Sequence, residues 1–360
     1  MKYIFIGLLL ATFQKENFSF QLKPFPQIKN LWRNTRLLPL WTPLDYISNI
    51  NNPKPVLLDG EQFVQYKNRN KTYILLFDNC PHQGAQLSQG TLQGNNLICA
   101  YHGFKFRNGK FIGVPMSDRI HNSPLCVPRI PTLVKNNMVY FLPFTDMHNG
   151  DNIESKLVPE PYIAPEESEP NFTKVTGKVY IKKNCDIITA NVLDMLHISF
   201  VHSFGNRKSP LPHKIKYREI NDMSGKTTFL YSSGDKSLSK NLGNCNEVIV
   251  ENEFYLPSTT VTRVIANNLT KIVVTRALPI NENETVLFWE VHRNFFNGNH
   301  IIESIGNIVM SFLMTQTLNE DINILKYVNE KYWMGTINTK YDITINNFLK
   351  AKSKYNSHLL

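Results

Sequence analysis

Two short segments of the chain each combine one cysteine with one histidine. The first reads Cys-Pro-His and contributes Cys80 and His82, and the second reads Cys-Ala-Tyr-His and contributes Cys99 and His102. Thiolates and imidazoles both bind metal ions, and zinc accepts two of each. In zinc fingers, however, the cysteines are paired with each other and so are the histidines. The mixed pairs favour a [2Fe–2S] cluster in which one iron takes both thiolates and the other takes both imidazoles.

The residues around these four candidate ligands suit such a cluster. Pro81, Gly84 and Gly103 favour bent backbones that can direct amide groups towards sulfur and so tune the reduction potential. Two neutral imidazoles in place of thiolates raise that potential. The alternatives are a structural zinc ion and a chance coincidence of spacing, and a colourless purified protein would favour zinc.

A second set of candidate ligands lies in the segment NVLDMLHISFVH, residues 191–202. His197 and His202 are five positions apart, which separates them by about 140° on a regular α-helix. They can share a metal only if the helix is broken or bulged there, and the poor helix formers between them allow that. Taken alone the pair is a weak signal, because such histidines are more often ordinary surface or core residues.

These two motifs, in this order, resemble those of Rieske-type non-heme iron oxygenases. The segments CPHQGAQLSQG and CAYHGFKF are similar to that family's cluster-binding loops, and the pattern D-x2-H-x4-H is similar to its iron-binding motif. The resemblance covers roughly residues 31–335. Gln83 stands where the family often has Arg, and Phe104 where it often has Trp, but neither is a ligand.

The resemblance implies a metal-binding role for each candidate ligand. The ligands of the [2Fe–2S] cluster would be Cys80, His82, Cys99 and His102. A mononuclear Fe(II) would be bound by His197, His202 and one carboxylate of a late helix, with positions left open for O2 and substrate. Of the two carboxylates available there, Glu320 and Asp321, the family pattern favours Asp321.

Two further residues of the second motif have counterparts in the family. Asp194 matches an aspartate that links a cluster histidine of the neighbouring subunit to an iron-ligand histidine. Asn191 would lie nearby in a supporting role. The resemblance therefore implies a head-to-tail homotrimer, because in that family the two metal sites of one subunit are too far apart for efficient electron transfer.

The implied activity is an oxidation that uses O2. An NAD(P)H-dependent reductase, a ferredoxin or both would supply electrons, and a small aromatic or cyclic organic substrate would be hydroxylated or oxidatively demethylated. The alternative is a Rieske electron-transfer protein without mononuclear iron. The chain lacks the C-x-x-C pair and the C-terminal membrane segments that pheophorbide a oxygenases commonly carry, which argues against close kinship with that branch.

The elements that must position these residues divide the chain into two parts. Residues 31–145 contain short strands separated by Gly, Asn and Pro turns, which indicates an all-β module, the Rieske domain of the resemblance. Residues 146–172 are acidic, Pro-rich and aperiodic, as a linker is. Residues 173–335 alternate as antiparallel strands do, with helices expected near 186–202 and over 300–333. The fold class is therefore α+β, and the resemblance implies a helix-grip (START-like) sheet in the second part.

The two ends of the chain lie outside these parts. Residues 1–30 contain the apolar run MKYIFIGLLLATF and are expected to be a targeting segment, for example to a plastid, or an N-terminal arm. Residues 336–360 are polar and are expected to be a frayed tail. The stretch IGNIVMSFLM in the last helix is interrupted and is expected to be a core helix, so that the mature protein is soluble in the cytoplasm or an organelle.

The composition excludes several other classes of protein. With 360 residues, 42% hydrophobic and 19% charged, the chain can form two domains with a sizeable core. The net charge of +10 is not clustered, which argues against a nucleic-acid partner. Five cysteines are too few for a disulfide framework. The aromatic residues that could line a substrate pocket, but more simply belong to the core, are Phe200, Phe204, Phe254, Tyr255, Trp289 and Phe312.

Overall fold

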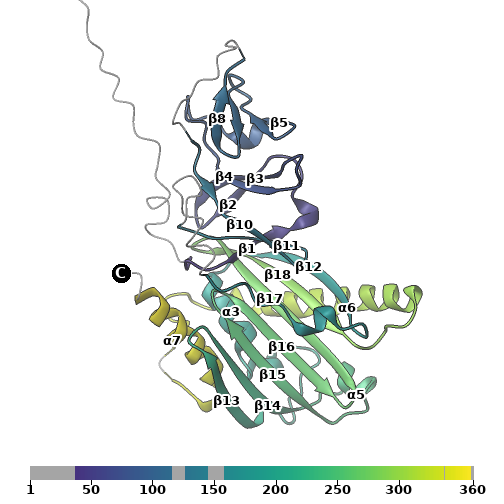
Figure 1. Ribbon diagram of the computed structural model, residues 1–360. Coiled ribbons are helices and arrows are strands. Elements are labelled where there is room, and N and C mark those ends of the chain that lie inside the picture. The colour runs from purple at the N-terminus through teal and green to yellow at the C-terminus, as the bar shows by residue number, and fades with distance from the viewer. Residues whose placement is uncertain (1–36, 116–125, 145–157, 336, 358–360) are drawn as a thin grey trace, which may run out of the picture.

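The computed structural model describes residues 37–115, 126–144, 158–335 and 337–357. The segment 1–30, expected to be a targeting segment or an arm, lies outside these residues. The described chain forms an N-terminal part of small sheets and a second part built on one large sheet with helices (Figure 1). The predicted α+β class and the order of its two parts are confirmed.

The N-terminal part contains three small antiparallel sheets. The first consists of β1 (Thr42–Tyr46), β11 (Met138–Phe141) and β10 (Thr132–Lys135). The second consists of β2 (Lys54–Leu58), β3 (Glu61–Lys67), β4 (Tyr73–Phe77) and β9 (Arg129–Ile130). The third consists of β5 (Thr91–Gln93), β6 (Asn96–Ile98), β7 (Lys105–Arg107) and β8 (Lys110–Gly113). Short 3₁₀ turns are η1 (Ile47–Asn49) and η2 (Leu87–Gln89).

The N-terminal part shares a hydrophobic core with the large sheet. All five residues of β4 are buried, as expected for a central strand rich in Ile, Leu and aromatic residues. Leu278 and Phe288 of the large sheet join the same cluster. The Tyr46 hydroxyl lies 3.1 Å from the carbonyl oxygen of Gly177 and 3.0 Å from that of Trp289. These contacts fix the cluster-binding module against the second part.

The second part is built on a seven-stranded antiparallel sheet in the order β12-β18-β17-β16-β15-β14-β13. The strands are β12 (Thr173–Ile181), β13 (His213–Asn221), β14 (Ser224–Ser232), β15 (Glu247–Tyr255), β16 (Thr259–Ala266), β17 (Leu269–Asn281) and β18 (Glu284–Arg293). The helices are α3 (Cys185–Leu193), α4 (His197–Val201), α5 (Leu238–Asn241), α6 (His300–Leu325) and α7 (Ile343–Ser357), with 3₁₀ turns η4 (Pro165–Ser168) and η5 (Lys340–Asp342).

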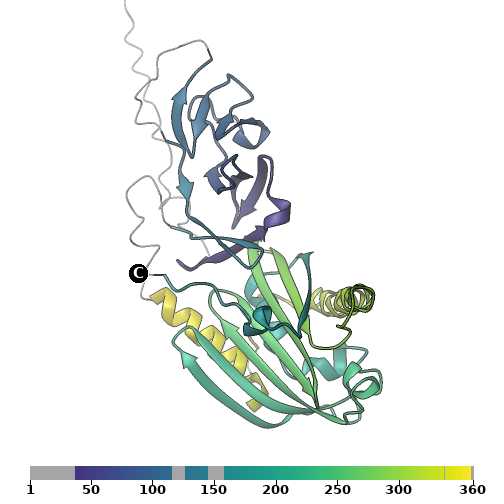
Figure 2. The same cartoon turned by 45° about the vertical axis from the view of Figure 1, so that its right-hand side comes forward.

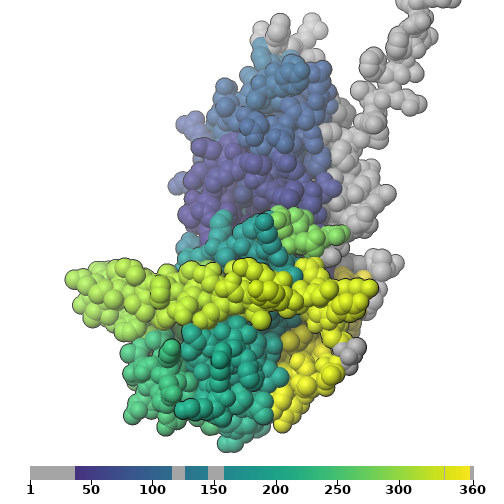
Figure 3. Space-filling view, turned by 180° about the vertical axis from the view of Figure 1, so that it is seen from behind, coloured from purple at the N-terminus to yellow at the C-terminus, as the bar shows by residue number. Residues whose placement is uncertain are grey.

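The two faces of the large sheet are covered differently. Side chains of α3 and α6 pack on Ala277, Leu287 and Trp289, and α7 packs beside α3 on the same face (Figures 1 and 2). Seen from behind, α6 lies across this face (Figure 3). The opposite face is covered by the N-terminal part and by the described end of the expected linker, where Tyr162 and Ala164 pack on Val274. The candidate second motif therefore lies on the helix-covered face.

Two helix boundaries differ from the sequence prediction. The helix expected near 186–202 is broken between α3 and α4, where Asp194 adopts an extended conformation. The helix expected over 300–333 ends at Leu325, because the next amides bond three residues back and begin a turn: Tyr327 to Ile324, and Val328 to Leu325.

The expectation of a frayed tail is wrong for residues 343–357, which form α7. Thr339 and Asp342 form a capping box at the start of η5, which leads directly into α7. One face of α7 buries Phe348 and Thr344 completely, and the Thr344 hydroxyl lies 2.6 Å from that of Thr227 on β14. The many Lys and Asn residues of this segment occupy the other faces and concealed its apolar face in the sequence.

The expectation that α6 is a core helix holds for one face only. Met310 and Leu318 are buried, whereas Ile305, Ile308 and Phe312 are exposed by 56%, 70% and 67%. Among the described residues α6 is the one helix with the length and hydropathy of a membrane span, with 22% of that window buried. Length and composition alone are weak evidence for a span, and α6 packs along β12 and contacts α4.

Candidate metal centres

The loops that carry the first motif have the same backbone pattern. The amide of Cys80 donates to the carbonyl of Ala85, and the carbonyl of Cys80 accepts from Gly84. In the second loop Cys99 pairs in the same way with Phe104 and Gly103. Both glycines have positive φ, 72° and 67°, a conformation that favours glycine. The two turns therefore place their cysteines in equivalent positions, whereas the histidine follows two residues after Cys80 and three residues after Cys99.

The four candidate cluster ligands form two pairs. The thiols of Cys80 and Cys99 are buried, and burial together with the neighbouring Cys99 raises the pKa of Cys80 to about 11. The histidines are exposed, and their Nδ1 atoms, from His82 and His102, are 3.1 Å apart. A single zinc ion would require all four donors around one point. No three of these donor atoms lie within 4.8 Å of one another, although all four residues are described, so the arrangement fits two irons better than one zinc.

The exposed end of this module is aromatic. The ring of His82 stacks on Phe104 at 4.3 Å, so the residue that replaces the family's usual Trp contacts a candidate ligand. Tyr101, which is 63% exposed, packs against His102 with ring centroids 3.7 Å apart. Gln83 is also exposed. The histidine side of the candidate cluster site is therefore accessible to another protein.

The break between α3 and α4 positions the second motif. Asp194 terminates α3, and its Oδ1 accepts a hydrogen bond from the amide of Leu196 at 2.7 Å. His197 then begins α4, and His202 leaves that helix in an extended conformation with ψ of 140°. The helix thus ends before the second histidine, and the two rings lie only 5.0 Å apart. The break that the sequence required for a shared metal is present.

The two imidazoles converge on one oxygen of Asp321. The Nε2 atom of His197 is 3.4 Å from Asp321 Oδ1, and the Nε2 atom of His202 is 3.6 Å from the same oxygen. One donor atom of each residue lies within 4.8 Å of the other two. Asp321 Oδ1 is buried and has no hydrogen-bond partner in the described residues. A buried carboxylate oxygen without a donor is costly, so this oxygen fits a metal ion.

The other ring nitrogens are held by neighbouring oxygens. Nδ1 of His197 donates to the backbone carbonyl of Asp194 at 3.0 Å, and Nδ1 of His202 lies 3.1 Å from the carboxylate of Glu320. Because a carbonyl oxygen only accepts, this hydrogen bond places the Nδ1 proton of His197 and leaves its Nε2 lone pair free when the ring is neutral. Two His and one carboxylate on one face are typical of non-heme iron(II) sites.

The electrostatics of the metal-free ligands are asymmetric. Burial lowers the pKa of His197, but the adjacent carboxylate of Asp321 outweighs this effect and raises that pKa above its usual range. Burial lowers the pKa of His202, and the nearby carboxylates do not reverse the effect. Ser203 and Gln316 hold Glu320 in place, and these contacts keep its pKa low despite burial. A metal ion would take the place of a proton on Nε2 of His197.

The other residues that the sequence analysis singled out, Asp194, Asn191 and the aromatic candidates, differ in their contacts with this site. The Asp194 side chain is 30% exposed and its Oδ2 is 3.9 Å from Nδ1 of His197. Asn191 lies in the last turn of α3, where its carbonyl accepts from the Asp194 amide at 3.2 Å. Of the aromatic candidates, Phe204 stacks on His202 with ring centroids 4.9 Å apart. The sequence analysis considered Glu320 only as an alternative to Asp321, whereas the structure places it behind His202.

Phe254 and Trp289 are buried core residues, as expected. Tyr255 stacks on Tyr162 at 4.0 Å, on the side of the linker segment. Phe200 and Phe312 are 56% and 67% exposed, so neither is in the core. Phe204 is therefore the one aromatic candidate with a ring contact to a candidate iron ligand.

Two family models match the chain. Residues 40–131 match the Rieske [2Fe-2S] domain, and residues 181–347 match the vanillate O-demethylase oxygenase C-terminal domain. The first match contains all four candidate cluster ligands, and the second contains the His-His-Asp group. The chain therefore belongs to the Rieske-type non-heme iron oxygenases, with a Rieske domain followed by an oxygenase C-terminal domain.

Sequence relatives include a plant and a bacterial oxygenase. The chain is 29% identical over 222 residues to pheophorbide a oxygenase of Arabidopsis thaliana, covering 56% of this chain and 41% of the relative. It is 26% identical over 148 residues to the vanillate O-demethylase oxygenase subunit of a Pseudomonas strain, covering 41% and 42%. The chain thus spans less than half the length of these relatives. A pheophorbide a oxygenase is thus among the relatives, although the chain lacks the C-x-x-C pair that this branch commonly carries.

Solved structures share the fold over almost the whole chain. Dicamba monooxygenase bound to dicamba superposes with a TM-score of 0.70 at 17% identity, covering 89% of this chain and 97% of that one. NdmA of Pseudomonas putida with caffeine superposes with a TM-score of 0.72 at 18% identity, covering 92% and 94%. At such identities the likeness establishes the fold alone.

Proposed function

We propose that this chain is the catalytic subunit of an oxygenase that uses O2 and externally supplied electrons to hydroxylate or oxidatively demethylate a cyclic or aromatic organic compound. The observation that carries the proposal is the buried oxygen of Asp321, which has no hydrogen-bond donor and faces the Nε2 atoms of His197 and His202. An electron-transfer protein would have no use for this group.

The arrangement of the candidate ligands supports one set of residues for each proposed cofactor. The [2Fe–2S] cluster would be held by Cys80, His82, Cys99 and His102, and the mononuclear iron by His197, His202 and Asp321. When bound, the cluster supplies electrons singly and the iron activates O2 beside the substrate. The protein contributes the ligand geometry and a site shielded from water.

Residues behind the ligands keep the imidazoles in one orientation. The Asp194 carbonyl and the Glu320 carboxylate hold the two Nδ1 atoms, so both Nε2 atoms point to the same place. We infer that the Asp194 side chain also links this site to a cluster histidine of a neighbouring subunit, because it is partly exposed beside His197. Asn191 would support Asp194 through the hydrogen bond at the end of α3.

The proposed assembly is a head-to-tail homotrimer. The β5–β8 sheet, near which both candidate cluster histidines lie, is at the far end of the molecule from α5 (Figure 1). His82 and His102 are exposed there, and a second subunit could bring them to a neighbour's Asp194. An NAD(P)H-dependent reductase, a ferredoxin or both would deliver electrons to the same exposed surface. The pheophorbide and vanillate of the relatives' names support a cyclic substrate.

Metal analysis tests the proposal directly. Protein purified without oxygen is expected to contain about three irons and two sulfides per chain, with the electron paramagnetic resonance spectrum of a Rieske cluster after reduction. His197→Ala is expected to retain the cluster spectrum and lose about one iron. If the wild type contained only two irons per chain and His197→Ala had the same iron content, the oxygenase proposal would be excluded. A role in electron transfer would then remain. A colourless protein that contains zinc would exclude both.

A further inference from the structure

Lys271 lies on the face of the large sheet that carries the candidate iron site. It precedes Val273 by two residues in β17, and Val273 packs with the helices on that face. Side chains two residues apart in a strand point to the same side. Its neighbour across the strand pair, Val264 on β16, belongs to a cluster with Met195, which lies in the break before His197.

An aromatic ring connects Lys271 with the candidate iron site. The Lys271 ammonium is 6.0 Å from the centre of the Phe204 ring, and Phe204 stacks on His202 at 4.9 Å with an interplanar angle of 15°. The sum of these two distances, 6.0 Å and 4.9 Å, is the largest possible separation between the Lys271 ammonium and the centre of the His202 ring, about 11 Å. An organic molecule of one or two rings can bridge such a separation.

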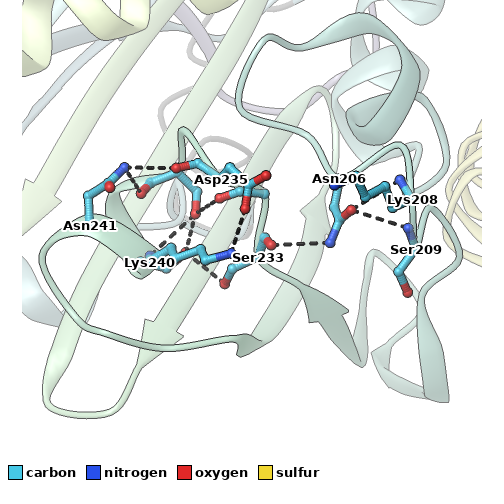
Figure 4. A network of polar contacts seen from close by, with 10 residues as sticks. Asn206, Lys208, Ser209, Ser233, Asp235, Lys240 and Asn241 are labelled. Atoms are coloured by element: carbon cyan, nitrogen blue, oxygen red, sulfur yellow. Dashed lines mark hydrogen bonds and ion pairs between the residues drawn. The ribbon is translucent and has the colours of Figure 1, made fainter.

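The loop that carries Phe204 is fixed in place. Asn206 donates to the carbonyl of Ser233 at 3.2 Å, and its own side-chain oxygen accepts from Lys208 and Ser209 (Figure 4). The polar contacts continue on the other side of Ser233, towards Asp235 and α5 (Figure 4). A Cβ at Gly234 would come within 2.2 Å of the Phe204 carbonyl oxygen. The Phe204 ring is therefore a fixed surface between His202 and Lys271.

Lys271 and its neighbour Arg293 have no carboxylate partner. Among the described residues, no carboxylate oxygen lies within 4.0 Å of either cation, and the Lys271 ammonium has no hydrogen bond. Arg293 is directly opposite on β18 and is fully buried. Its guanidinium contacts the Asn307 side chain and backbone carbonyls, and its Nε is without a partner. Burial lowers the pKa of Lys271, and no nearby anion opposes the effect.

Three buried or partly buried cations on the opposite face of the same sheet are compensated. Arg263 pairs with Glu166 and Glu253, Arg276 with Glu290, and Lys174 with Glu167. The charge of Glu303 partly offsets the effect of burial on the pKa of Arg293, whereas no anion does so for Lys271. A cation without an anion is costly in a partly buried position. The helix-covered face therefore lacks one negative charge at this point, and a ligand can supply it.

We propose that Lys271 binds the carboxylate of the substrate, and that the substrate is therefore a cyclic organic acid. Its ring would lie along Phe204, and the carbon to be oxidised would face His202 and Asp321. Arg293 would add positive potential without direct contact, because its two terminal nitrogens are engaged by Asn307 and by backbone carbonyls. This inference rests on the proposed oxygenase function and specifies its substrate class.

Binding of matched acids and amides to the full-length, iron-loaded protein tests the inference. Isothermal titration calorimetry would compare a panel of methoxybenzoates with the corresponding methoxybenzamides, which differ in charge and hardly in shape. At least one acid is expected to bind about tenfold or more tightly than its amide. Lys271→Met should abolish this preference and leave amide binding unchanged, whereas Lys271→Arg should retain it. The inference would be overturned if none of the acids bound. It would also be overturned if Lys271→Met preferred acids over amides as strongly as the wild type does.

A second measurement requires no ligand. Lys271→Met removes an uncompensated charge and is expected to raise the melting temperature by about 2 °C or more, whereas the control Lys174→Met removes a paired charge and should lower it. A fall in Lys271→Met equal to that of the control would mean that Lys271 has a partner within the protein. Iron content measured in parallel separates the proposals: missing iron in the wild type contradicts the oxygenase, and full iron without charge preference contradicts only the carboxylate site.

Discussion

The large sheet carries one histidine–carboxylate cluster on each face. On the helix-covered face, His197, His202 and Asp321 bring three donor atoms within 4.8 Å of one another. On the opposite face, a second group of three residues also brings one donor atom of each within 4.8 Å of the other two. That group consists of Glu167, Glu290 and His292. Judged by donor type and spacing alone, both clusters could hold a metal ion.

The two clusters differ in what neutralises their carboxylates. Arg276 lies 3.2 Å from Glu290, and Lys174 forms an ion pair with Glu167. Although burial alone would raise the pKa of Glu290, the adjacent His292 and Arg276 lower it to about 2. In the other cluster, within the part of the chain that the structure describes, no Lys or Arg contacts Asp321 and its buried oxygen has no hydrogen-bond donor. The cluster of Glu167, Glu290 and His292 is therefore an internally balanced ion network. The cluster of His197, His202 and Asp321 requires an added cation.

The largest expected effect comes from neutralising the carboxylate of each cluster in turn. Asp321→Asn should lower the iron content from about three to about two per chain and reduce product formation to background, because the third iron ligand loses its charge. Glu290→Gln should leave the iron content unchanged. It should lower the free energy of unfolding by about 3–5 kcal/mol, because Arg276 then remains buried without a partner.

Iron analysis and denaturant unfolding measure the two outcomes on the same preparations. Loss of iron in Glu290→Gln together with full iron in Asp321→Asn would reverse the assignment of the two clusters. Asp321→Asn is not expected to destabilise the metal-free chain, because the oxygen that it alters has no hydrogen bond to lose.

Acid provides a second and smaller contrast. The pKa of Glu290 is about 2 in the folded chain and 4.5 ordinarily, so its charge stabilises the fold fully above pH 4.5. This contribution, on the order of 3 kcal/mol, should disappear as the pH falls from 4.5 to 2. The difference in unfolding free energy between wild type and Glu290→Gln should therefore shrink over this range. A difference that stays constant with pH would mean that Glu290 is not held ionised by its neighbours.

Much of the fold was predictable because its signals are local. The mixed Cys-His pairs, the alternating strands and the end of the helix before His202 each follow from neighbouring residues. The end of α6 and the existence of α7 did not follow, because tertiary contacts decided them. Phe348 stabilises α7 by packing on Phe254, almost a hundred positions earlier, within a segment whose composition is polar.

The candidate site was predictable in its ligands but not in its supporting residues. Glu320 and Asp321 are adjacent and chemically similar, and only the direction of each side chain from α6 separates them. Asp321 points between the two Nε2 atoms, and Glu320 points behind His202. Lys271 gave no signal at all, since a lysine in a β-strand is ordinary until the absence of a partner is known.

The smallest of these effects concerns Glu320 and tests whether it orients His202 without binding the iron. Glu320→Gln preserves the shape of the side chain and weakens its hydrogen bond to Nδ1 of His202. Iron affinity or kcat/KM should fall by about 10–100-fold, the usual loss when a ligand-orienting carboxylate is altered. Gln316→Ala, which removes a neighbour 3.4 Å from Glu320, is the matched control and should have a smaller effect.

Titration of the metal-free chain with Fe(II), with the spectrum of the reduced cluster as an internal reference, distinguishes the two roles of Glu320. Complete loss of the mononuclear iron in Glu320→Gln, as in Asp321→Asn, would make Glu320 a ligand, contrary to the distances. An affinity within about twofold of the wild type would mean that the backbone alone orients His202. An intermediate loss of Fe(II) affinity, with an unchanged spectrum of the [2Fe–2S] cluster, would assign different roles to the two adjacent carboxylates: Asp321 binds the iron and Glu320 orients His202. Residues of similar chemistry would then differ in function between neighbouring positions of one helix, as they do between the two faces of the sheet.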